Sequence, residues 1–152
     1  MEEMIGGSMM NQIKLFILIL VVFLAVDLPM ILIINKQLYT DQFSKIGQAT
    51  SSVTIWLSAI ICYILMALSL QFFAVNEHSL IKASLLGFVM FGVYNTTNLA
   101  TIENYEVKTA AIDTAWGTAL YTLVYLIVVY GLSRFIISSD DSLAETTTNI
   151  DN

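Results

Sequence analysis

The chain has little of what most catalytic and nucleic-acid-binding proteins depend on. Its 152 residues include one cysteine, one histidine and one proline, and only 12% of them are charged. With Cys62 alone an intrachain disulfide is impossible, and no cluster of His and Cys is present to hold zinc or haem. The six Lys and Arg residues do not gather into a patch that would bind nucleic acid. We therefore expect no metal, no cofactor and no nucleic-acid partner.

Familiar catalytic motifs are also missing from the sequence. It has no Gly-rich loop ending in Lys for phosphate, no Gly-x-Ser-x-Gly elbow and no potassium-filter loop. The only histidine, His78, falls in an expected turn far from the acidic residues discussed below, so the commonest general base is not available to them. These absences favour a protein that is not an enzyme, but they leave the question open.

Hydrophobic residues, in contrast, make up 57% of the chain, and the charged fraction is about half that of an ordinary soluble domain. The hydrophobic residues fall in runs of about 20 or more, which is the length that a helix needs to cross roughly 30 Å of hydrocarbon. The sequence therefore predicts an all-α integral membrane protein. The expected spans are 13–34, 53–75, 81–100 and 110–137.

Short polar turns between these runs predict antiparallel hairpins, and hence a four-helix bundle with both termini on the same side of the membrane. Polar, acidic tails at 1–12 and 138–152 are expected to be disordered. Three basic residues flank the spans on each side, so the positive-inside rule gives a tie. We take cytoplasmic termini in a cell membrane as the working orientation, and a viral membrane is the alternative.

Two features break the apolar pattern before the second span. Pro29 cannot donate to the carbonyl of Ala25, so the first span is expected to kink there and leave that oxygen free. The long connection that follows includes an amphipathic stretch, 37–46, which predicts a helix lying on the bilayer surface. Its apolar face would be formed by Leu38, Tyr39, Phe43 and Ile46.

Polar residues lie inside the spans, where hydrocarbon makes them costly. Asp27 is about two turns from the end of span one, the Asn and Thr residues at 95–98 end span three, and Asp113 is about one turn into span four. In an alternating bundle these ends share one side, at depths that agree within roughly 10 Å. We predict that they converge on a small polar or cationic ligand. The candidate ligand-binding residues are Asp27, Tyr94, Asn95, Thr97, Asn98, Asp113 and Trp116.

Helical spacing refines the expected faces, because residues three and four apart lie on one side. Tyr94, Asn98 and Thr101 would form one stripe, and Asp113 and Trp116 would share another with small residues that allow close packing. Spans three and four are therefore expected to pack face to face. The competing interpretation is that the Asn and Thr residues only lock the helices together, and that the aspartates lie near the lipid headgroups.

Two motifs resemble a known family. Residues 94–101 read Tyr-Asn-Thr-Thr-Asn-Leu-Ala-Thr, and residues 113–118 read Asp-Thr-Ala-Trp-Gly-Thr. Over about 13–131 the chain resembles the predicted multi-pass membrane proteins grouped as domain of unknown function 2177. The resemblance implies a small four-span protein of unassigned activity, with relatives in bacteria and in large DNA viruses. Asn95 departs from the family pattern, which has Asp there, and this weakens any cation or proton role that needs a carboxylate at that position.

Three functional hypotheses follow. The first is a non-enzymatic protein that binds a small polar or cationic ligand in the membrane as part of a transport path, as a homo-oligomer because four spans leave little room for a complete permease. The second is a membrane enzyme or accessory factor in lipid modification, with Asp27 and Asp113 as acid and base. The third is a structural or assembly protein whose polar residues hold helices together.

Overall fold

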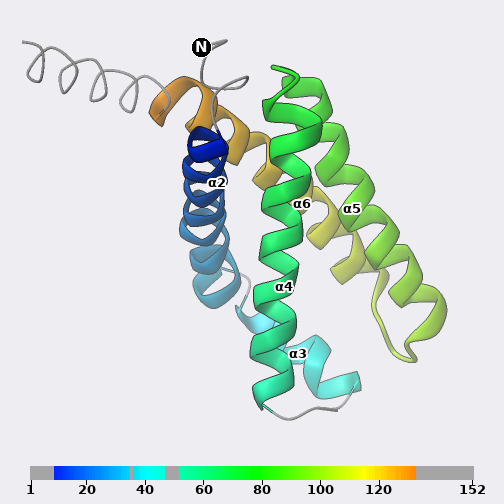
Figure 1. The fold of residues 1–152 in the computed structure, drawn as a ribbon. Coiled ribbons are helices and arrows are strands. Elements are labelled where there is room, and N and C mark those ends of the chain that lie inside the picture. The colour runs from blue at the N-terminus through cyan, green and yellow to red at the C-terminus, as the bar shows by residue number, and fades with distance from the viewer. Residues whose placement is uncertain (1–8, 35, 47–51, 133–152) are drawn as a thin grey trace, which may run out of the picture.

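A computed structural model describes residues 9–34, 36–46 and 52–132 of the chain. This part consists of helices and short turns, with no strand in it. Four of its helices carry segments long and apolar enough to cross a membrane, which confirms the all-α, four-span prediction. These helices are α2 (Met9–Pro29), α4 (Ser52–Leu70), α5 (Leu80–Thr101) and α6 (Val107–Leu126) (Figure 1).

Three of the four long helices continue as π-helix, which has one more residue in each hydrogen-bonded turn. The π segments are η1 (Met30–Ile34) after α2, η2 (Gln71–Val75) after α4, and η3 (Ile127–Leu132) after α6. At the first of these, the change follows Pro29 directly, where the missing N–H removes an α-helical bond. The winding therefore changes from α to π at the proline, while the kink and the free Ala25 carbonyl oxygen stay predictions.

The helices alternate in direction. Tight connections join α4 to α5 at 76–79 and α5 to α6 at 102–106. The first described residues of α2 and the last of η3 lie at the same end of the bundle, as predicted for the termini (Figure 1). The short helix α3 (Lys36–Ile46) lies at the opposite end and agrees with the helix expected at 37–46; the side chains of its expected apolar face lie outside the described set.

Helices α5 and α6 make the closest contact. A Cβ atom added at Gly87 would lie 2.5 Å from the carbonyl oxygen of Gly117, and one added at Gly117 would collide with the ring of Phe91. Only glycine allows the two backbones to approach this closely, as expected for small residues at helix interfaces in lipid. The predicted face-to-face packing of spans three and four is confirmed.

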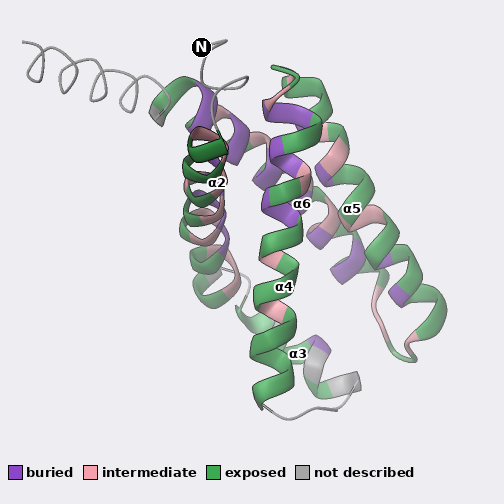
Figure 2. Cartoon of the chain, viewed as in Figure 1, coloured by how far each residue is buried: buried purple, intermediate pink, exposed green. Residues whose placement is uncertain are grey.

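The core of the bundle lies among α2, α4 and α6, and its largest fully buried side chains include Ile19, Phe23, Leu70 and Tyr121. Tyr121 packs edge-on against Phe23 at 5.1 Å, and its hydroxyl lies 3.1 Å from that of Ser69. Buried positions concentrate on the inward faces and near one end of α4, whereas the first half of α4 is almost entirely exposed (Figure 2). A surface of exposed apolar residues is what a bilayer-embedded protein presents to lipid.

Two helix starts differ from the expected spans. Helix α2 begins at Met9, so residues 9–12 of the expected tail are helical, and α6 begins at Val107, earlier than the expected 110. In both cases a polar side chain from another element bonds the start of the helix: Gln71 bonds the carbonyl oxygen of Gln12, and Gln42 bonds the amide of Glu106. The rest of the two tails, 1–8 and 138–152, and the expected end of the fourth span at 137 lie outside the described residues.

Candidate functional site

Asp27 is a buried carboxylate on α2, 6% exposed. Trp116 Nε1 on α6 donates to its Oδ1 at 2.7 Å, and the Tyr63 hydroxyl on α4 donates to its Oδ2 at 2.8 Å. Both oxygens therefore accept a bond from a neutral donor on another helix. Such bonds hold the carboxyl group in one orientation and partly replace the water that it loses on burial.

Asn95 on α5 is the second polar centre and is 1% exposed. Its Nδ2 donates to Asp113 Oδ2 at 2.8 Å and to the carbonyl oxygen of Phe91 at 2.9 Å, and its Oδ1 accepts from the Tyr105 hydroxyl at 2.6 Å. A carboxylate and a carbonyl can only accept, so these partners fix which end of the amide carries the nitrogen. Asn95 therefore links α6 to the turn between α5 and α6.

Helix α6 joins the two centres. Asp113 and Trp116 are three residues apart and share a face of α6, and Trp116 donates to Asp27, so α6 carries a residue of each centre. All four long helices and the α5–α6 turn contribute to a set of polar side chains, which forms two hydrogen-bonded groups that share helix α6. We call this set the polar layer: Asp27, Tyr63, Asn95, Asn98, Tyr105, Asp113 and Trp116.

Five of the seven predicted site residues lie in the polar layer, and two do not. Tyr94 is 61% exposed and Thr97 is also exposed, so both point away from the bundle. The expected stripe of Tyr94, Asn98 and Thr101 does not form the contact face, because Tyr94 and Thr101 are exposed and Asn95 and Asn98 are buried. The close contact at Gly87 sets the rotation of α5 and turns position 95, two helical turns further on, towards α6.

Sequence reasoning missed two members of the polar layer, both tyrosines. Tyr63 lies in the middle of α4, and its hydroxyl donates to Asp27 Oδ2. A tyrosine far from a membrane interface needs a partner for its hydroxyl, and that signal could have identified Tyr63. Tyr105 lies in the α5–α6 turn, and its hydroxyl donates to Asn95 Oδ1.

The turn that carries Tyr105 is held by α3. Gln42 is buried, its Nε2 donates to the carbonyl oxygen of Asn104 at 3.1 Å, and its Oε1 accepts from the Glu106 amide at 3.0 Å. Burial raises the pKa of the Tyr105 phenol, and a hydrogen bond with Asn98 only partly offsets this. The phenol therefore stays protonated and keeps donating. Helix α3 and the turn together cover the polar layer at this end of the bundle.

A groove of about 710 Å³ runs along the outer side of the α5–α6 pair. Small and hydroxyl-bearing side chains, including Gly92, Ala115 and Thr118, line most of it, and Asn95 and Thr114 form part of its wall. Thr114 Oγ1 also accepts from Asn95 Nδ2, at 3.3 Å. The polar layer thus borders a hollow that opens towards the surroundings of the bundle.

The fold and the polar layer define the class: an integral, multi-pass membrane protein with four spans in contact with the lipid bilayer. The chain belongs to the family described as predicted membrane protein (DUF2177), whose family model matches residues 12–130. The family resemblance of the two motifs is thereby confirmed. Comparisons with curated proteins and with solved structures give no match.

Proposed function

We propose that the polar layer binds a small cation or protonated amine within the membrane. The observation that carries the proposal is a pair of buried aspartates: Asp27 accepts from Trp116 on α6, and Asp113 lies three residues before Trp116 on the same helix. An ionised carboxyl group in a low-dielectric interior is costly unless a positive charge, either a bound cation or a proton, compensates it. Ionisable residues inside membrane spans are accordingly associated with ion and substrate pathways.

Among the described residues, no lysine side chain is buried within the bundle. Every lysine whose side chain the structure describes is exposed. These residues are Lys14, Lys36, Lys82 and Lys108. Trp116 and Tyr63 orient the Asp27 carboxyl group but bring no charge, and Asn95 does the same for Asp113. The layer therefore offers carboxylate and carboxamide oxygens, which suit a cationic ligand.

Two routes of access support the proposal. From the bilayer side, the α5–α6 groove reaches the wall formed by Asn95 and Thr114. From the other side, displacing Tyr105 would free Asn95 Oδ1 for a ligand. Access from both sides is what a step in transport requires, and transport of the bound cation is the finer form of the proposal.

The test compares the purified full chain in lipid nanodiscs with its Asp27→Asn and Asp113→Asn variants. Thermal stability is measured in chloride salts of sodium, potassium, methylammonium and choline at equal ionic strength. A bound cation stabilises the folded state by about 2.7 kcal/mol at one hundred times its Kd, which is several degrees in Tm. We expect at least one salt to raise Tm in the wild type and this rise to shrink in both variants.

Glu103→Gln is the matched control, because Glu103 is an exposed carboxylate in the α5–α6 turn. The Glu103→Gln variant should keep the full effect of the salt on Tm.

Transport is tested in liposomes with the same proteins, where flux of the stabilising cation should fall in both aspartate variants. Equal responses to every salt in the wild type and the aspartate variants would contradict the binding proposal.

A second candidate function, structural locking, is favoured by a specific observation. Both oxygens of Asp27 and both polar atoms of Asn95 already have partners in the protein. A polar layer that only holds helices together would lose stability in the aspartate variants to the same extent in every salt. The salt series therefore separates the two functions.

A further inference from the structure

A second polar site lies at the other end of the bundle and is independent of the polar layer. It is built on Gln71, in the π segment η2, which is 3% exposed. Gln71 Nε2 donates to the carbonyl oxygen of Gln12 at 3.1 Å and to Gln12 Oε1 at 2.7 Å. The backbone carbonyl can only accept, so it fixes the nitrogen end of the Gln71 amide. The other end, Oε1, is buried and has no hydrogen-bond partner among the residues that the structure describes.

Asn76 presents a second oxygen of the same kind. Its Oδ1 is buried, and no residue in the described part of the chain forms a hydrogen bond with it. The Asn76 amide donates to the carbonyl oxygen of Gln71 at 2.9 Å, so the two residues lie one π turn apart. The amides of His78 and Ser79 donate to the carbonyls of Val75 and Ala74. These amides of the turn are therefore committed and give neither side-chain oxygen a donor.

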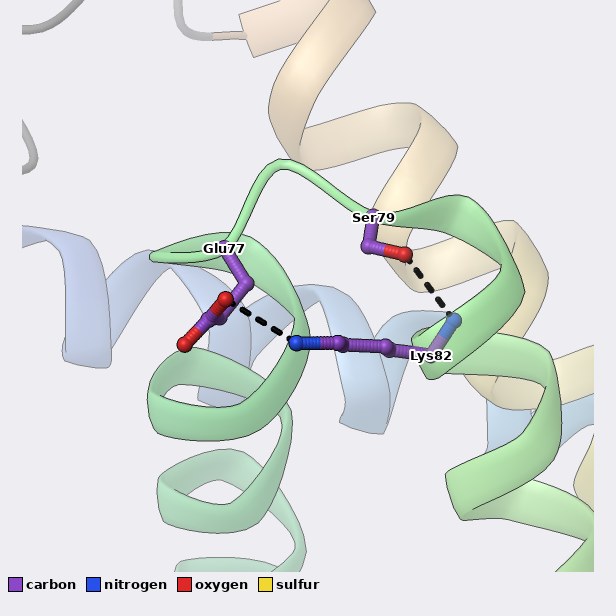
Figure 3. A network of polar contacts seen from close by, with 3 residues as sticks. All are labelled: Glu77, Ser79 and Lys82. Carbon is purple, nitrogen blue, oxygen red and sulfur yellow. Dashed lines mark hydrogen bonds and ion pairs between the residues drawn. The ribbon is translucent and has the colours of Figure 1, made fainter.

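The surrounding charges favour a positive ligand at these oxygens. Gln71 and Asn76 lie at the C-terminal end of the α4–η2 helix, where backbone carbonyls concentrate negative partial charge. Glu77 and Lys82 form an exposed ion pair at 2.9 Å and balance each other (Figure 3). The Ser79 hydroxyl oxygen accepts from the Lys82 amide and caps the first turn of α5 (Figure 3). This cap offsets part of the positive end of that helix.

We propose that Gln71 Oε1 and Asn76 Oδ1 are ligands of a binding site for a small monovalent cation: K⁺, Na⁺ or ammonium. Buried acceptors without donors require a partner, and two of them beside a helix C-terminus match the way in which membrane proteins hold such ions. Carboxamide oxygens carry no formal charge, so the site suits a single positive charge better than a divalent ion. The backbone bond from the Asn76 amide to the Gln71 carbonyl oxygen places the two residues one turn apart at the end of η2.

The full chain in nanodiscs tests this proposal through its Tm in potassium, sodium, ammonium and N-methylglucamine chloride at equal ionic strength. N-methylglucamine serves as the bulky reference cation. We expect at least one small cation to raise Tm above the N-methylglucamine value, and Asn76→Leu to remove that part of the rise. Asn76→Asp keeps the shape and adds a negative charge, so it should lower the half-saturating cation concentration by about tenfold.

Two controls make the result specific. Gln37→Leu changes an exposed carboxamide on α3 and should leave the cation effect intact. Asp27→Asn, which alters the polar layer at the other end, should leave the Asn76-dependent part of the effect unchanged. A cation effect lost in Asp27→Asn but kept in Asn76→Leu would overturn this site while supporting the first one. Equal Tm values in all four salts would also overturn it, because water would then satisfy the two oxygens.

Discussion

At the scale of single residues, the Asp27 carboxyl group depends on two neutral donors. Trp116 Nε1 is the shorter contact, at 2.7 Å, and the Tyr63 hydroxyl is at 2.8 Å. Removing one partner of a buried hydrogen bond costs more than the bond contributes, because the other partner remains buried without its donor. Trp116 is therefore a stabilising residue of the fold as well as a positioning residue of the polar layer.

Trp116→Phe keeps most of the ring volume and removes the donor. We expect it to lower the free energy of unfolding by about 1–3 kcal/mol, the usual penalty for an unsatisfied buried polar group. Reversible unfolding of the protein in mixed detergent and lipid micelles measures this change. Trp56→Phe is the matched control, since Trp56 is 71% exposed and should contribute little. Equal losses in the two variants would show that the indole hydrogen bond is not the cause.

The sequence identified most residues of the polar layer through their depth in the spans. Asp27, Asn95, Asn98, Asp113 and Trp116 were found because alternating spans bring their ends to one side. The rotation of each helix could not be read in the same way. Adjacent polar residues at 94–98 are compatible with several faces, and the choice depends on a tertiary contact at Gly87 that no local pattern specifies.

At the scale of elements, the α5–α6 pair is the most closely packed part of the bundle. Gly87 and Gly117 let the backbones meet, and Phe91 fills the space over Gly117. Because Asn95 and Asp113 lie on the same two helices, their 2.8 Å bond requires this approach. The distance between the helices therefore controls the geometry of the site.

Gly87→Ala should separate α5 from α6, because the added Cβ would lie 2.5 Å from the Gly117 carbonyl oxygen and 2.9 Å from Tyr121 Cβ. We expect a loss of about 1–3 kcal/mol, as for other overpacked interiors. Gly92→Ala is the control on the same helix, since its nearest heavy atom would be Thr114 Cγ2 at 3.8 Å. Thermal unfolding of both variants in nanodiscs checks the prediction, and a Gly92→Ala loss as large as that of Gly87→Ala would contradict it.

Element types and approximate bounds followed from the sequence, but the π segments did not. A proline explains η1, whereas η2 and η3 have no proline and follow ordinary apolar residues. Their extra residue per turn depends on packing against other helices, which periodicity over one span does not record. The same limit applies to Gln71, whose partner Gln12 is 59 residues away in the sequence.

At the scale of the whole molecule, the two polar sites lie at opposite ends of the bundle and have different chemistry. The polar layer holds two carboxyl groups and is covered by α3 and the α5–α6 turn. The second polar site holds the carboxamide oxygens of Gln71 and Asn76 beside the α4–α5 turn. Between them, Phe23, Leu70, Leu120 and Tyr121 are fully buried and close the core. A ligand that crosses the bundle must therefore move these side chains.

The arrangement of the turns makes a final prediction about topology. Helix α5 separates the α4–α5 turn, with Glu77, from the α5–α6 turn, with Glu103, and α3, with Asp41, lies on the Glu103 side. Because Cys62 is the only cysteine, Cys62→Ser gives a background without thiols. In that background, Glu77→Cys, Glu103→Cys and Asp41→Cys each place one reporter at an exposed position.

Sealed vesicles of one orientation are treated with a maleimide that cannot cross membranes. Both reporters on the α3 side should react alike, and the Glu77→Cys reporter should behave oppositely, because a single span separates the two groups. Lysis before labelling should make all three react. The basic residues are balanced between the two sides, so the charge pattern cannot choose the orientation, and this labelling determines it. Equal reactivity of Glu77→Cys and Glu103→Cys in intact vesicles would mean that α5 does not cross the bilayer, and the proposed polar layer could not then lie within it.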